Sequence, residues 1–403
     1  MTDRVPLKRV ASVRPSSVDK KSREGESTVR LCNYTDVYYH ETIRPTMEFM
    51  PATATQGQLA HFSLCHGDVI LTKDSETADD VGIPAFVDDP PVDLVCGYHL
   101  TLIRPNQGRL DGRYLFWQMS ATHVRQTWEA TAAGVTRVGL RAETVANLPI
   151  RVPALAEQRS VADFLDSETA RIDAFIAKKQ RLSELSGMRA AAQAEHLLGR
   201  FNDVPLQHLT DAKRPIVYGI VQAGPEDPEG VPYIKSGDIA GLESRELSRT
   251  AMSIHRQYAR SHVRPGDIVV AMRASIGALT LVPPSLPEAN LTQGTARVAA
   301  GPGVDGLWLY HVLRLRRIQE EMNVRAVGTT FRTLNIWDLR RIRIPTPPTD
   351  EQHRLAQQVE SIRRRADTAT RLLERQIQLL REHRQALITA AVSGELEVPG
   401  VAA

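Results

Sequence analysis

Pro153-Ala-Leu-Ala-Glu-Gln158 returns 194 residues later as Pro347-Pro-Thr-Asp-Glu-Gln352, and each copy is followed by a long stretch without proline. The same offset relates Gly134-Val-Thr-Arg-Val-Gly-Leu140 to Gly328-Thr-Thr-Phe-Arg-Thr-Leu334. This period is far above the roughly 20–50 residues of a solenoid repeat. We therefore interpret the chain as the product of a domain-scale duplication.

The repeat separates each half of the chain into two unlike parts. The first part covers 1–152 in one copy and 201–346 in the other, and is rich in proline, glycine and short apolar runs. Runs such as Asp68-Val-Ile-Leu-Thr72 are typical of strands, and other segments have helical periodicity. We therefore expect an α/β (α+β) protein with two similar mixed domains.

The second part of each copy predicts one long helix, over 153–200 and 347–394, and a short tail remains at 395–403. A helix of roughly 45 residues is about 65 Å long, more than the diameter of a 150-residue domain. Each helix could lie on its own domain, but pairing of the two would bury both apolar seams at once. The seam of the first helix is Val161, Leu165, Ile172, Phe175, Leu182 and Leu185; that of the second is Leu355, Val359, Ile362, Ala366, Ala369, Leu373, Leu380 and Leu387.

Capping signals stand at the helix ends. Thr349-Asp-Glu-Gln352 has the spacing of a capping box, in which the Thr349 hydroxyl accepts from the backbone of Gln352 and the Gln352 side chain reaches back. Ala154 occupies the corresponding place in the first copy, so that helix start is less well specified. Gly199 and Gly394 are predicted to end the two helices in the C′ position.

Composition is that of an ordinary globular chain. Its 403 residues are 42% hydrophobic and 24% charged, which predicts two or three domains and excludes whole-chain disorder. Only three cysteines occur, without C-x-x-C, so we expect a reducing, cytoplasmic compartment. The N-terminus has no apolar signal core, and no apolar run approaches the roughly 18 residues of a membrane span. The formal charge is only +3, which leaves room for a local basic patch.

Catalytic motifs are largely missing. There is no P-loop and no His-Glu-x-x-His, and Asp89-Pro-Pro-Val92 has valine where the loop of an amino-methyltransferase would carry an aromatic residue. His61, Cys65 and His66 are close in sequence, but without a fourth ligand we interpret them as structural. We therefore expect no enzymatic activity, no cofactor and no metal in this chain.

A basic segment lies near the end of the second domain. Its Gly328-Thr-Thr-Phe-Arg332 loop offers Thr329, Thr330 and Arg332, which are phosphate- or base-binding types, and Gly328 lets the backbone come close. The alternative is a solvated helix face with ion pairs such as Arg316–Glu320 or Arg317–Glu321. We favour nucleic acid, because this loop lies within the basic segment. The first copy repeats the pattern with Thr136, Arg137 and Arg141. The arginines of the segment are 314, 316, 317, 325, 332, 340, 341 and 343.

A second candidate region follows the Gly-Asp strand of each domain. Lys73 and Ser75 stand there in the first copy, and Arg273 and Ser275 in the second. A cation with a small hydroxyl fits phosphate or groove contact, and equally an ordinary surface turn. Lys235 is a weaker third candidate. Because aromatic residues are only 5%, a stacking platform for single strands is disfavoured and duplex DNA is the expected partner.

This pattern closely resembles the specificity (S) subunits of type I restriction–modification enzymes. Two α/β domains, each followed by a long helix that a Pro-x-x-x-Glu-Gln segment opens, carry the likeness over nearly the whole chain. The second helix departs from the family form at Glu360-Ser-Ile-Arg-Arg-Arg-Ala-Asp367. The stretches that carry it are Pro153 to Asp173, Ile344 to Gln352, Arg384 to Leu396, Gly67 to Ser75 and Gly82 to Ala85.

The resemblance implies a DNA-recognition role. Each α/β domain would be a target recognition domain that reads one half of a bipartite, asymmetric duplex site. The two helices would pair as an antiparallel coiled coil, set the spacing and dock two modification subunits. Those subunits would use S-adenosylmethionine, and restriction subunits would use ATP and Mg. The alternatives are a specificity subunit of another restriction system, or a coiled-coil scaffold that binds no DNA.

Overall fold

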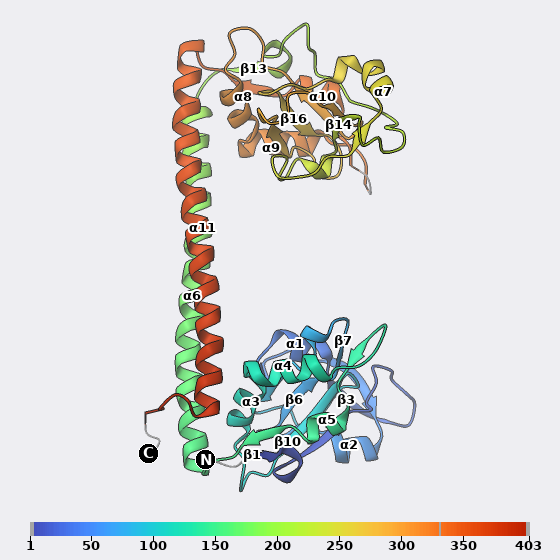
Figure 1. The fold of residues 1–403 in the computed structure, drawn as a ribbon, viewed down its shortest axis with the longest axis vertical. Helices are drawn as coiled ribbons and strands as arrows, with labels where there is room; N and C mark the ends of the chain where they lie inside the picture. Colours follow the sequence, from blue (N-terminus) through green and yellow to red (C-terminus); the bar gives the residue numbers. More distant parts are fainter. Residues whose placement is uncertain (1–3, 330–331, 400–403) are drawn as a thin grey trace. The chain divides into compact units, whose positions relative to one another are not determined.

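The computed structural model describes residues 4–329 and 332–399. The chain forms two compact units: unit 1 comprises Met1–Lys179 with Arg375–Ala403, and unit 2 comprises Gln180–Glu374. Each unit combines one α/β domain with parts of the two long helices, α6 (Leu155–Leu198) and α11 (Thr349–Ser393) (Figure 1). The expected fold class, two similar mixed α/β domains that are each followed by a long helix, is confirmed.

The domain of unit 1 is built around two sheets. A five-stranded sheet has the order β2-β10-β6-β8-β4, and a three-stranded sheet has the order β5-β3-β9. Strand β6 is buried at all four positions, as expected for a central strand. The elements are β1 (Arg4–Pro6), η1 (Leu7–Arg9), β2 (Ala11–Pro15), β3 (Ser27–Cys32), α1 (Tyr34–Tyr39), β4 (Thr42–Ile43), β5 (Met50–Ala54), α2 (Gln56–Phe62), β6 (Val69–Thr72), β7 (Asp74–Ser75), η2 (Ala78–Asp80), β8 (Pro84–Val87), β9 (Leu94–Cys96), β10 (Leu100–Pro105), α3 (Gly112–Ser120), α4 (Thr122–Thr131), β11 (Val138–Gly139), α5 (Ala142–Ala146) and β12 (Pro149–Arg151).

The domain of unit 2 repeats this plan with shorter strands. Its two main sheets have the orders β17-β16-β19 and β15-β14-β18. Helices α8 and α9 stand where α3 and α4 stand in unit 1. The elements are β13 (Asp203–Pro205), η3 (Leu206–His208), β14 (Val231–Ile234), η4 (Ser236–Asp238), β15 (Arg249–Thr250), α7 (Met252–Gln257), η5 (Ala259–Ser261), β16 (Ile268–Ala271), β17 (Leu279–Leu281), β18 (Asn290–Leu291), β19 (Thr295–Val298), α8 (Gly306–Leu313), α9 (Arg316–Arg325), α10 (Ile336–Arg340) and β20 (Arg343–Pro345).

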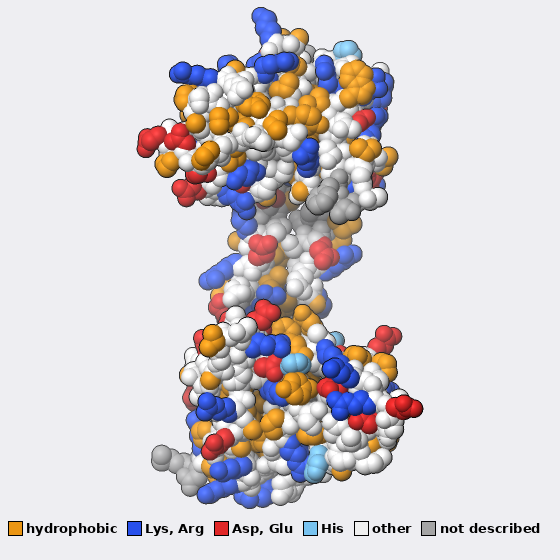
Figure 2. Space-filling model, turned by 90° about the vertical axis from the view of Figure 1, so that its right-hand side faces the viewer, with side chains coloured by type: hydrophobic (Ala, Val, Ile, Leu, Met, Phe, Trp, Pro, Cys, Tyr) orange, Lys and Arg blue, Asp and Glu red, His pale blue; other side chains and the backbone are white. Residues whose placement is uncertain are grey.

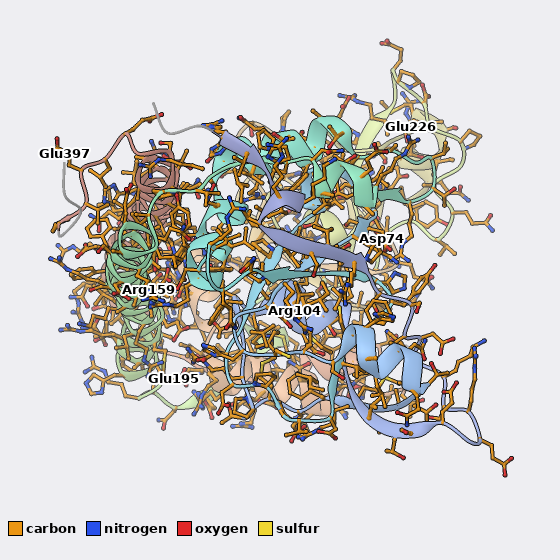
Figure 3. All side chains as sticks on the ribbon, turned by 90° about the horizontal axis from the view of Figure 1, so that it is seen from below. Asp74, Arg104, Arg159, Glu195, Glu226 and Glu397 are labelled. Atoms are coloured by element: carbon orange, nitrogen blue, oxygen red, sulfur yellow. The ribbon has the colours of Figure 1, made fainter. Side chains whose placement is uncertain are left out.

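One buried carboxylate shows how the duplicated domains have diverged. Asp68 precedes β6 and accepts two hydrogen bonds, of 2.8 and 2.7 Å, from Arg104 of β10 (labelled in Figure 3). In unit 2 the corresponding Asp267 is held instead by Arg214, from the loop after η3, at 2.8 and 2.5 Å. A buried carboxylate needs a charged partner, but the fold accepts that partner from a different segment.

The long helices pair within each unit and run antiparallel. In unit 1 the Lys179 ammonium donates to the Gln376 side chain at 2.6 Å, and the Asp173 carboxylate lies 3.1 Å from the Arg384 guanidinium. Residues with lower numbers on α6 thus face residues with higher numbers on α11. In unit 2 the Ser183 and Thr370 hydroxyls are 3.3 Å apart. The expected pairing of the helices is therefore present in both units (Figure 1).

The expected apolar seam is wrong in its middle part. Val161, Leu165 and Ile172 are buried, but Phe175, Leu182 and Leu185 are 45%, 55% and 44% exposed. Val161 and Leu165 also pack in the hydrophobic core of the first domain, whereas Phe175, Leu182 and Leu185 belong to no core cluster of the described residues. Leu372 and Leu379 of α11 are also exposed.

The glutamines of the repeated motif do not form the predicted capping box. The N–H of Gln352 donates to the carbonyl of Pro348, not to the Thr349 hydroxyl, so the helix starts one residue earlier than the box requires. The Gln352 side chain accepts from the N–H of Asp305 at 2.9 Å and donates to Pro347. Gln158 does the same in unit 1, where it accepts from Asp111 at 2.8 Å. Each glutamine thus ties a helix start to its domain.

The two helix ends also differ from each other. Gly394 has φ +80° and ends α11 in the left-handed conformation that the sequence predicts. Gly199 follows α6 but does not adopt that conformation. Its N–H still donates to the carbonyl of Glu195, as in the helix, and a turn continues the chain. Within the described ranges, no helix is both long and apolar enough to cross a membrane.

Candidate nucleic-acid interface

Two matching loops leave the two domains. In unit 1 Ala133 and Gly139 exchange backbone hydrogen bonds of 3.2 and 3.0 Å and close a loop over 134–138. In unit 2 Val327 and Thr333 exchange bonds of 3.0 and 2.9 Å and close 328–332. Both loops begin with a glycine in the left-handed region, and at Gly134 a Cβ would lie 1.8 Å from the Arg137 carbonyl oxygen. The sequence repeat therefore marks a repeated loop whose turn requires glycine.

Each loop lies against the segment that follows the central strand of its domain. In unit 1 β11 pairs with β7, so that Gly139 faces Asp74 and Leu140 donates to the carbonyl of Lys73. In unit 2 Thr333 bridges to Arg273, and Leu334 donates to the carbonyl of Met272. The fold thus brings together the two regions that the sequence singled out separately. The structural correspondence of the two segments differs by one residue from the one that the sequence suggests: Arg273 matches Asp74, and Met272 matches Lys73.

The charged groups of the first loop gather on Asp74 (labelled in Figure 3). Its carboxylate lies 2.9 Å from Nδ1 of His99 and 3.7 Å from the Arg137 guanidinium. Lys73 lies over the ring of Tyr98 at 4.0 Å, and partial burial lowers its pKa. The sequence does not predict the contacts of Tyr98 and His99. These residues come close to Lys73 only in the folded domain, where the N–H of Lys73 donates to the carbonyl of His99.

The predicted residues of unit 1 differ in accessibility. Thr136, Arg137 and Arg141 are exposed, and Val135 beside them is fully exposed. Ser75 is buried and donates to Asp80 at 3.0 Å, so its hydroxyl has a structural partner. The exposed side chains of this region therefore come from the loop and not from Ser75.

The predicted residues of unit 2 also meet. Arg273, Ser275, Thr329 and Arg332 are exposed, and Arg332 donates to the carbonyl of Asn323. Thr330 lies outside the described residues. Another segment joins them, since Arg273 reaches Gln293 at 3.4 Å and Ser236 donates to Gly294 at 2.9 Å. Lys235, next to Ser236, donates to the Ser248 hydroxyl at 2.6 Å.

Comparison with known proteins finds similarity to type I restriction enzyme specificity subunits. Residues 221–378 match the model of the Type I restriction modification DNA specificity domain. The EcoBI specificity subunit of Escherichia coli is 25% identical over 66% of this chain and 62% of its own length. The putative MjaX specificity subunit of Methanocaldococcus jannaschii is 20% identical over 85% of this chain and 81% of its own. Residues 221–378 of this chain therefore match that family, and both curated relatives are named as type I restriction enzyme specificity subunits.

Solved structures support the fold of this chain. A chain from a study of complex assembly and conformational transition of the type I R-M system superposes with a TM-score of 0.75 at 18% identity, covering 98% of both chains. The HsdS subunit of Thermoanaerobacter tengcongensis gives 0.56 at 16% identity, covering 98% of this chain and 97% of its own.

The basic segment near the end of the second domain is not one free patch. Arg316 pairs with Glu320 at 3.7 Å, as the ion-pair alternative expects. Glu321 pairs with Arg325 rather than with Arg317, which instead holds Asp203 at 3.0 Å. Figure 2 shows basic side chains interspersed with acidic and apolar ones on the displayed face of each unit. The loop arginines are therefore better interface candidates than the helical ones.

The three residues that are close in sequence, His61, Cys65 and His66, do not form a set of metal ligands in the described part of the chain. His66 lies 3.4 Å from Asp88 and accepts from the backbone of Asp89. The structure thus offers no reason to revise the structural interpretation of these three residues.

Proposed function

We propose that this chain supplies the DNA sequence specificity of a type I restriction–modification complex. Each domain reads one half of a bipartite, asymmetric duplex site. The limits proposed are 1–152 and 201–346 for the recognition domains, with helical spacers over 153–200 and 347–394 and a tail at 395–403. In this proposal the chain contributes recognition and leaves catalysis to other subunits, in keeping with the specificity-subunit names of its relatives.

One observation carries this proposal: the same loop frame bears different side chains in the two domains. Loop 134–138 holds Val-Thr-Arg-Val after its glycine, whereas loop 328–332 holds Thr-Thr-Phe-Arg. Across from them stand Asp74 in one domain and Arg273 in the other. A shared frame with unlike reading groups suits an asymmetric target, because hydrogen-bonding side chains distinguish base pairs in the major groove.

The helices are proposed to dock two modification subunits. Phe175, Leu182 and Leu185 leave apolar area exposed on α6, as Leu372 and Leu379 do on α11. In the proposed complex the modification subunits bind S-adenosylmethionine and methylate the target, and restriction subunits supply the ATP- and Mg-dependent cleavage.

Duplex binding at rising salt tests the proposal. The chain is purified with its modification subunits, and the affinity for duplexes that contain or lack the methylated motif is measured. A recognition complex loses affinity steeply with salt, with a slope of about −0.9 per phosphate contact, and prefers the motif. A scaffold that binds only proteins shows neither effect. Methylome sequencing of the source strain with and without the gene identifies the motif.

A further inference from the structure

We propose that unit 2 holds a divalent transition-metal site made by His255, His262 and Glu288. Nε2 of His255 and Nδ1 of His262 each lie 3.4 Å from Oε1 of Glu288. In a tetrahedral zinc site with bonds of about 2.0–2.1 Å, ligand atoms lie roughly 3.4 Å apart. The three donors thus already have the separations from the carboxylate that an ion placed between them requires, and water would complete the shell.

The protonation of His262 suits a ligand. Its Nε2 lies 2.9 Å from the carbonyl oxygen of His255, and because a carbonyl only accepts, Nε2 carries the proton. The lone pair of the neutral ring is then on Nδ1, the nitrogen that faces Glu288. Metal-binding histidines usually donate their second N–H to such an acceptor, which orients the ring.

The surroundings hold the site in place and leave it accessible. Buried Arg297 donates to the carbonyl of His262 at 2.5 Å, and the adjacent Ser261 hydroxyl bonds Asn290 at 2.5 Å. His255 is buried, and its Nδ1 has no hydrogen-bond partner. The carboxylate of Glu288 is 57% exposed, so an ion can reach the donors from solvent.

The relative orientation of the His255 and His262 rings shows what must change when a metal ion binds. The two imidazoles are stacked, with centroids 3.7 Å apart and planes at 12°. A lone pair lies in its ring plane, so parallel rings cannot both aim at one ion. His262 and Glu288 have room to turn because both are partly exposed. We expect the two rings to tilt out of their stack when the ion binds, with His262 keeping its Nε2–H bond to the His255 carbonyl.

The duplicated domain shows that the cluster is not a by-product of the fold. Backbone pairing makes Asp93 the counterpart of Glu288, Ser63 that of His262, and Arg30 that of Pro232. In unit 1 the carboxylate of Asp93 is neutralised by Arg30 at 2.5 Å. In unit 2 proline has removed this cation, and two imidazoles face the carboxylate instead.

The site would join three segments of unit 2. His255 lies on α7, His262 follows η5, and Glu288 precedes β18. The chain runs on from β18 to Gln293, which contacts Arg273. A bound ion would therefore stabilise the part of the domain that supports the second loop, although the metal proposal itself does not depend on DNA binding.

Zinc titration of the untagged, EDTA-treated full chain tests the proposal. We expect one Zn²⁺ per chain by calorimetry, and a tetrahedral Co²⁺ absorption band when Co²⁺ replaces it. At a zinc concentration about 100-fold above Kd, unfolding of unit 2 should shift upward by about 5 °C. His262→Asn and Glu288→Gln should each weaken binding by about 100-fold or more, because even the loss of outer-shell partners costs 10–100-fold.

His66→Asn is the matched control, because His66 is also paired with a carboxylate, Asp88 at 3.4 Å, but has no second histidine. It should leave zinc binding unchanged. The proposal is overturned if the wild-type chain binds no Zn²⁺ at micromolar concentrations. It is equally overturned if the stoichiometry and affinity persist in both His262→Asn and Glu288→Gln.

Discussion

Gln158 fastens helix α6 to the first domain by hydrogen bonds from a single buried amide. Its oxygen accepts from Asp111, and its nitrogen donates to the carbonyls of Arg109 and Pro153 at 2.9 and 2.8 Å. Gln352 repeats the contact in unit 2. A glutamate could not donate to those carbonyls, which gives a physical reason for glutamine in both copies of the motif.

Removing either amide should destabilise its own unit. Gln158→Ala and Gln352→Ala leave buried backbone groups unpaired, which typically costs about 1–3 kcal/mol for each group. We expect a loss of about 3 kcal/mol in the free energy of unfolding of unit 1 and unit 2 respectively. Urea unfolding monitored in each unit measures it. The exposed Gln193→Ala on α6 should change stability by less than about 0.5 kcal/mol; an equal effect from Gln193 would argue against the contact.

His311 makes unit 2 sensitive to acid. Burial, helped by nearby Arg363, lowers its pKa to about 4, and Glu360 at 3.3 Å only partly opposes this shift. The unfolded chain, with a pKa near 6.5, therefore takes up a proton that the folded chain does not. This contribution is complete above about pH 6.5 and is lost as the pH falls towards 4.

We expect unit 2 to lose about 2 kcal/mol of stability from this residue between pH 7.5 and pH 5. His311→Leu should remove that part of the pH dependence, and exposed His196→Asn should keep it. Burial also lowers the pKa of His255, which acts in the same direction, so the comparison of variants isolates His311. Identical pH profiles for wild type and His311→Leu would refute the assignment.

Arg332 is the residue on which recognition by the second domain can be tested. We expect Arg332→Ala to lower the affinity of the assembled complex for its motif about tenfold or more, by loss of a phosphate or base contact. Arg316→Ala removes an exposed arginine already paired with Glu320 and should have a smaller effect. Unchanged affinity and methylation in Arg332→Ala would remove it from the interface.

At the scale of elements, the repeat predicts more than local patterns do. It identified both domains, both long helices and the two loops, because a duplicated fold repeats its glycines and apolar runs. The capping box failed because a distant turn at Asp305 competes for the Gln352 side chain. Tyr98 and His99 escaped prediction because the sheet, not the chain order, brings them to Lys73.

The paired helices are proposed to set the spacing between half-sites. One heptad inserted within 173–186 of α6, with a matching heptad in the facing part of α11, keeps the pairing and adds about 10 Å of helix. At about 3.4 Å per base pair this equals roughly three base pairs. Methylome sequencing should report a longer gap with unchanged half-sites. Altered bases with the original gap would contradict the proposed ruler, and an insertion in α6 alone should disrupt the pairing.

At the scale of the whole chain, each unit includes part of the long helix that follows the other domain. The end of α11 completes the core of unit 1: Ile388, Ala391 and Val392 pack in one cluster with Val161 and Leu165. Two contacts support them, since Thr389 accepts from the N–H of Thr122 at 3.1 Å and Gln385 donates to Ser120 at 2.8 Å. The first domain therefore depends on residues of the second long helix, far from it in the sequence.

Ile388→Ala tests this dependence without shortening the chain. The side chain is fully buried, so truncation should cost about 2–5 kcal/mol. Because the cavity lies in unit 1, proteolysis should become faster within residues 4–179, while cleavage within 180–374 should keep its rate. Leu379→Ala, at a 47% exposed position on the same helix, is the control and should cost much less. Equal losses in the two units would mean that the end of α11 does not belong to the first core.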